Sequence, residues 1–160
     1  CAALSADSIE YTLVLAGQGP DEKALRKLAD TLGIAGNVVF TGHVSDARLL
    51  HGLYRHARLF VFPSLYDTSG LVVREAAVME TPSVVVQDTA PAEVVTDGVN
   101  GFVCEDTTEA LTDVLRRALS QPERTRAMGI EARRTIPLPW DTVIDRAVVQ
   151  YRALIDERKM

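Results

Sequence analysis

The chain has 160 residues, of which 47% are hydrophobic and 24% are charged, and its formal net charge is −5. This length and composition are typical of one globular domain and argue against a disordered chain. The acidic balance argues against a protein that binds nucleic acid or an anionic membrane, because such a protein presents a basic face. No run of residues reaches the roughly 18 apolar positions that a membrane-spanning helix needs.

Short hydrophobic runs alternate with helical patterns along the chain. The runs predict strands near residues 12–16, 38–41, 59–62, 83–86 and 102–104. Between and after them, helical spacing predicts helices at about 21–32, after an N-cap at Ser45, from near Gly70, and at 108–119, 122–135 and 140–158. This alternation predicts βα units and one parallel sheet with helices on both faces, in a single domain over residues 1–160.

The two cysteines indicate neither a metal site nor a disulfide framework. Cys1 and Cys104 have no metal-ligand spacing, and a domain of this size does not need a disulfide. We therefore expect two reduced thiols in a cytoplasmic protein, with Cys104 packed as a small core residue.

The segment from Pro63 to Gln87 carries the strongest functional pattern. A strand ending at Phe62 leads into a loop of small residues, and a helix opens near Gly70. The first amides of a helix have no partner inside it and lie at the positive end of its dipole, so they accommodate a phosphate. Gly70 would let a ligand approach the backbone closely.

Two carboxylates eight positions apart flank this helix start. Glu75 lies on the same helix face as Leu71, and its side chain leans toward the helix mouth, where it could accept hydrogen bonds from a sugar diol. Asp67 lies just beyond the carboxyl end of the strand, where open α/β sheets bind their ligands. The alternative is that Asp67 or Thr68 only caps the helix and that Glu75 is a solvated surface group.

Four motifs in chain order resemble the retaining glycosyltransferases of family four, which have the GT-B fold. They are the Gly17-Gln18-Gly19-Pro20 turn after the first strand, the 37–44 segment, the 67–82 segment and the 97–103 segment. The third resembles the family's pattern of Glu, seven residues and Glu, with Asp67 at the first position and Glu75 at the second. Gly70, Leu71, Val72, Ala76 and Pro82 also match. The chain departs from the pattern at Asp67, at Thr68-Ser69 in place of Gly-Phe, and at Glu80, where the family usually has Gly.

The resemblance implies the C-terminal, donor-binding half of a GT-B hexosyltransferase that uses a nucleoside diphosphate sugar. Glu75 would hold the ribose hydroxyls and Asp67 the hydroxyls of the transferred sugar, so these two are the predicted catalytic carboxylates. The other predicted donor-binding residues are Gly17, Gly19, His43, Val44, Thr68, Ser69, Gly70 and Leu71. A UDP-sugar is the expected donor, no cofactor is expected besides it, and no metal site is expected because the chain has no Asp-x-Asp arrangement.

The resemblance also implies parts that precede this chain. An N-terminal acceptor domain would be the partner of this one and could bring the protein to a membrane surface. An Arg and a Lys that neutralise the diphosphate would lie upstream of Cys1, so we expect the 160-residue chain alone to be inactive. The terminal helix at about 140–158 would cross back to the acceptor domain and would expose apolar surface without it.

Other polar residues give weaker patterns. We expect His51 and His56 to be exposed helix residues, and Arg48 and Arg74 receive no role. The turn at Gly17 is not a dinucleotide fingerprint, because a third glycine and a later acidic residue are missing. The loop that ends in Glu93 resembles a family loop, but Glu93 could equally be a helix N-terminal charge.

Two other functions stay open at this point. One is a non-catalytic, flavodoxin-like regulatory or binding domain, although the loop after the first strand has no cluster of acids for a phosphoacceptor. The other is a GT-B epimerase or phosphorylase. The paired carboxylates favour glycosyl transfer over this second alternative.

Overall fold

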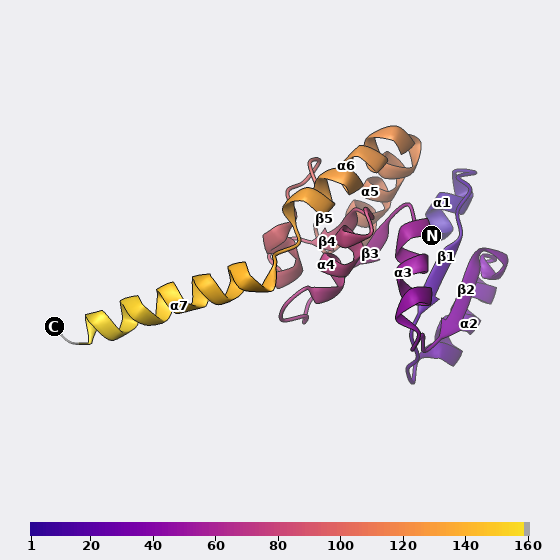
Figure 1. Ribbon diagram of the computed structural model, residues 1–160. Coiled ribbons are helices and arrows are strands. Elements are labelled where there is room, and N and C mark those ends of the chain that lie inside the picture. The colour runs from indigo at the N-terminus through magenta and orange to yellow at the C-terminus, as the bar shows by residue number, and fades with distance from the viewer. Residues whose placement is uncertain (159–160) are drawn as a thin grey trace.

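A computed structural model describes residues 1–158 and shows an α/β protein (Figure 1). The strands are β1 (Leu13–Ala16), β2 (Val38–Gly42), β3 (Phe60–Phe62), β4 (Ser83–Val86) and β5 (Gly101–Cys104). The helices are α1 (Ala2–Ala6), α2 (Glu22–Thr31), α3 (Ala47–His56), α4 (Leu71–Val78), α5 (Thr108–Ser120), α6 (Pro122–Thr135) and α7 (Trp140–Glu157), with 3₁₀ turns η1 (Ala35–Asn37) and η2 (Ala90–Val94). Every predicted strand and helix is confirmed to within two residues, whereas α1 was not predicted.

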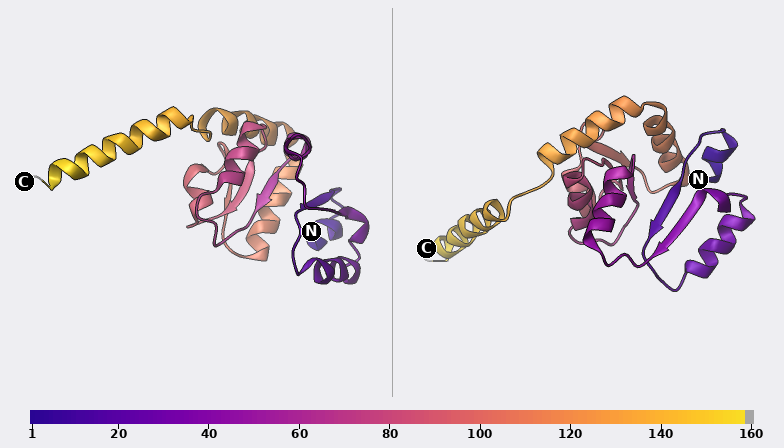
Figure 2. Two further views of the ribbon diagram at one scale, coloured as in Figure 1. Left: turned by 60° about the horizontal axis from the view of Figure 1, so that its bottom comes forward. Right: turned by 45° about the vertical axis from the view of Figure 1, so that its right-hand side comes forward.

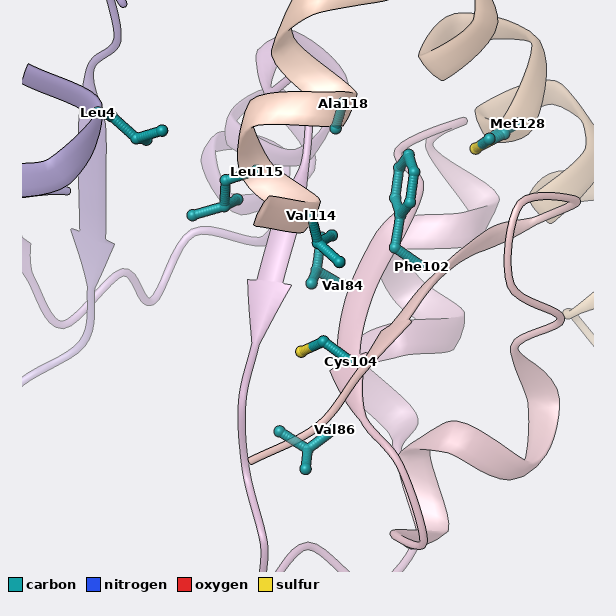
Figure 3. Close-up of a cluster of buried hydrophobic side chains, with 9 residues drawn as sticks. All are labelled: Leu4, Val84, Val86, Phe102, Cys104, Val114, Leu115, Ala118 and Met128. Atoms are coloured by element: carbon teal, nitrogen blue, oxygen red, sulfur yellow. The ribbon is translucent and has the colours of Figure 1, made fainter. Parts of the chain in front are cut away.

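The strands are parallel, as predicted, but they form two sheets rather than one. β1 pairs with β2, and β3, β4 and β5 form a separate sheet in that order. The sequence predicts one continuous sheet, whereas among residues 1–158 no hydrogen-bonded pairing joins β1 to β3. The chain leaves β2 through α3, which packs on α4 of the second sheet, and so reaches β3 without pairing it to β1. Strands of both sheets run in the same direction (Figure 1, Figure 3).

The core lies on both faces of the three-stranded sheet. Val84 and Val86 of β4 face one cluster, which α1, α5 and α6 complete (Figure 3). Val85 points the other way, into a second cluster formed with α4 and α6. All four residues of β4 are buried, as a parallel strand covered on both faces requires. Cys104 lies in the first cluster as a free thiol, as predicted, and burial raises its pKa.

Two helix ends show details that the sequence pattern does not settle. The N-cap of α3 is Asp46 and not Ser45, because the Asp46 carboxylate accepts a hydrogen bond from the Arg48 amide at 2.8 Å. At the end of α4, Glu80 has a left-handed φ of +63°. The amides of Glu80 and Thr81 donate to the carbonyls of Ala77 and Ala76, which is a Schellman motif, and its left-handed position is the one that glycine favours.

The terminal helix α7 extends away from the rest of the chain (Figure 1, Figure 2). None of its described residues is buried, and its apolar side chains are open to solvent, with Trp140 77% exposed and Tyr151 67% exposed. This confirms the expected exposed apolar surface. Within residues 1–158, no helix combines the length and apolarity that crossing a membrane requires.

Candidate functional site

The helix mouth predicted to bind a ligand forms where β3 leads into α4. Gly70 is the N-cap of α4 and has a φ of +58°, a conformation that other residues rarely adopt. A Cβ at this position would lie 3.1 Å from the Cα of Pro91 in η2. Gly70 therefore shapes the turn and lets η2 pack closely against it, a structural role that the sequence did not predict.

Asp67 turns its carboxylate back onto its own loop. Its Oδ1 accepts hydrogen bonds from the Ser69 amide at 3.0 Å and from the Gly70 amide at 2.5 Å. These two bonds, chiefly the one from Gly70, hold the pKa of the Asp67 carboxyl below its usual range. The capping role that the sequence left open for Asp67 is therefore present. The other oxygen, Oδ2, has no hydrogen-bond partner among residues 1–158.

Some of the backbone amides that the sequence predicted to face a ligand are therefore not free. The amides of Ser69 and Gly70, predicted to face a ligand, are engaged by Asp67. Within the described part of the chain, the amides of Leu71 and Val72 have no acceptor, whereas the next two donate to the Gly70 carbonyl. An anion at this mouth would meet the Leu71 and Val72 amides.

Glu75 is exposed but has a defined partner. The Tyr54 hydroxyl of α3 donates to Glu75 Oε2 at 3.4 Å. Tyr54 is buried, and its pKa rises to about 12, first because of burial and then because of the Glu75 charge and hydrogen bond. The sequence did not predict this contact, because nothing in it signals that α3 and α4 meet across 21 positions.

The other predicted donor-binding residues form a second group, on the two-stranded sheet. The Gly17 amide donates to the Gly42 carbonyl at 2.9 Å, so the turn that contains Gly17 and Gly19 lies beside the segment with His43 and Val44. His43 is exposed. Because the strands run in the same direction, this group and the Asp67 group lie at the same, carboxyl end of their sheets (Figure 1). No hydrogen bond among residues 1–158 joins the two groups.

Several remaining polar residues are placed by the structure. His51 and His56 are exposed on α3, as predicted. The Arg74 guanidinium donates to the Ile136 carbonyl at 2.6 Å and so caps the end of α6. Glu93 lies in the first turn of η2, which agrees with the alternative that it is a helix N-terminal charge. No three His, Cys, Asp or Glu side chains of residues 1–158 are grouped as metal ligands, and metal independence stays a prediction.

Parallel strands whose carboxyl ends lead into polar loops and a helix N-terminus are typical of nucleotide-binding α/β domains. Residues 1–135 match the family described as glycosyl transferases group 1, and the chain belongs to this family. The first alternative, a flavodoxin-like regulatory domain, is therefore not favoured.

Individual relatives agree with this membership. The chain is 34% identical, over 78% of its length, to a GDP-mannose-dependent alpha-(1-6)-phosphatidylinositol dimannoside mannosyltransferase of Mycobacterium tuberculosis, and it covers 32% of that protein. The chain spans about a third of the length of the curated relatives that it matches.

Solved structures share the fold. Sucrose-phosphate synthase from Thermosynechococcus elongatus superimposes with a TM-score of 0.81 at 23% identity, over 98% of this chain and 41% of that one. HepE of Anabaena in complex with UDP superimposes with a TM-score of 0.73 at 20% identity, over 89% of this chain and 41% of that one. The parallel α/β architecture is therefore that of GT-B glycosyltransferases.

Proposed function

We propose that this chain is the donor-binding domain of a retaining hexosyltransferase, which moves a hexose from a nucleoside diphosphate sugar to a hydroxyl of an acceptor. The observation that carries the proposal is the pair of carboxylates, Asp67 and Glu75, on either side of a helix mouth with two free amides. The group supplies acceptors for sugar hydroxyls and donors for a phosphate within one short segment. The chain's family membership supports this assignment.

Each part of the helix mouth has its own role in the proposal. Glu75 accepts hydrogen bonds from the ribose hydroxyls. Asp67 keeps its position through Oδ1 and offers Oδ2 to the hydroxyls of the transferred sugar. The Leu71 and Val72 amides face the diphosphate, where negative charge grows as the leaving group departs, and fixed donors aimed at such charge lower the barrier.

The nucleotide base is assigned to the second group of loops. The Gly17–Gly42 contact holds the turn with Gly19 next to His43 and Val44, at the same end of the molecule as the helix mouth. A UDP-sugar is the donor that we place first, and a UDP complex of HepE supports it. A GDP-sugar is the second candidate, because the mycobacterial relative is named as GDP-mannose-dependent.

The parent protein is proposed to supply the missing parts. An N-terminal acceptor domain would close over the donor, and an Arg and a Lys upstream of Cys1 would neutralise the diphosphate. We expect the 160-residue chain to bind the donor weakly and to transfer nothing by itself. The exposed apolar stripe of α7 is consistent with a helix that packs against that domain.

The direct test of the proposal is a titration of the ¹⁵N-labelled chain with UDP, GDP and ADP at millimolar concentration. We expect one of the three to shift the amide signals of Leu71, Val72 and Glu75 and of the loop around His43. Signals of α7 serve as the internal control. If none of the three nucleotides shifts the helix-mouth signals, the donor-site proposal is wrong for this chain.

The proposed mechanism is tested in the full-length parent. Asp67→Asn keeps an oxygen for the Ser69 and Gly70 amides but removes the charge, so we expect kcat to fall far more than the KM for the donor rises. Turnover should survive excess EDTA. A near-normal kcat of the variant would remove Asp67 from the mechanism, and a loss of activity in EDTA would overturn metal-independent transfer.

A further inference from the structure

Tyr54 is held in place from two sides. Its ring meets Phe60 of β3 edge-on, with ring centroids 5.2 Å apart and an interplanar angle of 82°. Its carbonyl accepts a hydrogen bond from the buried Thr81 hydroxyl at 2.5 Å. The side chain is only 8% exposed. Its hydroxyl is therefore a fixed point against which a neighbouring side chain can be oriented.

Glu75, in contrast, depends on that hydroxyl for its orientation. It is exposed on α4, and among residues 1–158 the Tyr54 hydroxyl is the one hydrogen-bond partner of its carboxylate, through Oε2 at 3.4 Å. An exposed Glu without such a contact samples many rotamers, and a ligand that needs one of them must offset the lost entropy. Oε1 stays available to a ligand.

We propose that Tyr54 is a positioning residue, whose hydroxyl holds the Glu75 carboxylate in the orientation that accepts the ribose diol of the donor nucleotide. The inference rests on the proposed function of Glu75 and adds the residue that sets its geometry. Burial and the Glu75 charge keep the pKa of Tyr54 near 12, so the hydroxyl stays a donor across the physiological pH range.

The test compares Tyr54→Phe with wild type by calorimetry. The probes are whichever of UDP, GDP and ADP binds the wild-type chain, and its 2′,3′-dideoxy form. We expect Tyr54→Phe to weaken binding of the ordinary nucleotide by about 3- to 10-fold, the effect of one lost hydrogen bond. Binding of the dideoxy form should not change, because it has no ribose diol for Glu75 to hold. In a Glu75→Gln background, the added Tyr54→Phe should change affinity much less.

The matched control is Tyr11→Phe. Tyr11 also makes a hydroxyl hydrogen bond, with Ser5 at 3.0 Å, but it lies outside both groups of proposed ligand residues. This variant should bind both nucleotides like wild type.

The outcomes separate this inference from the proposed function. If the wild-type chain binds none of the three nucleotides, both are wrong. If Glu75→Gln weakens binding while Tyr54→Phe does not, only the positioning role is wrong. Equal weakening of the ordinary and dideoxy nucleotides by Tyr54→Phe would also overturn it, because Tyr54 would then support the site only through folding.

A second measurement does not depend on how well Tyr54→Phe folds. Ultraviolet titration of the tyrosines should show one group that ionises near pH 12 in wild type and at a lower pH in Glu75→Gln. An unchanged titration would show that the two side chains do not interact in solution and would overturn the inference.

Discussion

The two sheets of this protein are both built from short apolar strands, but the surroundings of these strands differ greatly. All four residues of β4 are buried, and three of the four in β5 are buried. In the two-stranded sheet, Val14 and Val39 are register partners, and they are 41% and 47% exposed. An apolar run thus predicts a parallel strand, but it does not show whether both faces of that strand are covered.

The difference matters for the site, because the two groups of proposed ligand residues divide between the sheets. Asp67 and Glu75 are carried by α4 and its loop, on the half of the chain with two packed core clusters. The Gly17 and His43 loops belong to the two-stranded sheet, whose exposed face leaves it less stabilised by burial. We infer that the geometry of the helix mouth is set by the better-packed half.

The largest expected effect is in the contact between α6 and the end of α4. A Cβ at Gly129 would overlap the Glu80 carbonyl oxygen and lie 2.9 Å from its carbon, so Gly129→Ala must move backbone. We expect the free energy of unfolding to fall by about 3 kcal/mol. Gly36→Ala, in η1 of the other half, meets nothing within 4 Å and should change it by less than about 0.5 kcal/mol. Urea unfolding measures both, and equal effects would contradict the comparison.

A pair of valine truncations tests burial directly. Val85 is fully buried in β4, so Val85→Ala should lower the free energy of unfolding by about 2 kcal/mol. Val39→Ala removes the same atoms from an exposed position in β2 and should cost less than about 0.5 kcal/mol. Thermal unfolding of the two variants checks this. A cost for Val39→Ala close to that for Val85→Ala would show that β2 is covered in solution.

A smaller effect is expected at two helix ends that share one motif. α2 ends with Gly33 at a φ of +68°, whereas α4 ends with Glu80 at +63°. Glu80→Gly should raise the free energy of unfolding by about 0.5 to 1 kcal/mol, since a left-handed conformation is costly for Glu. It loses an exposed ion pair with Arg133, which contributes little. Gly33→Ala should lower the free energy of unfolding, because it places a Cβ in the left-handed conformation. If both changes lower it, the Glu80 conformation is not strained.

The smallest expected effect is a pH dependence at Asp67. Its pKa is lowered in the folded chain, so the carboxylate contributes stability above the unfolded-state pKa and loses it as the pH falls through the folded value. Asp67→Asn should therefore lose less stability on acidification than wild type. Carboxyl ¹³C chemical shifts during an acid titration follow Asp67 directly. A midpoint at or above its usual value would contradict the loop hydrogen bonds.

Local pattern predicted most of the secondary structure. β4 and α6 have the predicted bounds, because a bounded apolar run and a Pro at a helix start are local signals. The sequence predicts the cap of α3 one residue early, since Ser45 and Asp46 are both good N-caps and only geometry decides between them. The only sign of the left-handed turn at Glu80 in the sequence is that the resembled family usually has Gly at this position.

Long-range relations could not be predicted in the same way. The division into two sheets depends on which strand edges meet, and the apolar runs of β1 and β3 do not encode it. For the candidate site, the carboxylates and the helix start were identified from spacing. The amides that Asp67 occupies and the Tyr54–Glu75 contact were not, because they depend on loop geometry and on how α3 packs beside α4.

The most direct test of the donor-site account is the nucleotide affinity of Glu75→Gln, measured by calorimetry against wild type. We expect affinity for the bound nucleotide to fall by about 10- to 100-fold, because a charge-assisted hydrogen bond contributes on the order of 1.5–3 kcal/mol, while the thermal midpoint changes little. Glu109→Gln, in the first turn of α5, is the matched control and should bind like wild type. Unchanged affinity together with a collapse of thermal stability would show that Glu75 is structural and would contradict the account.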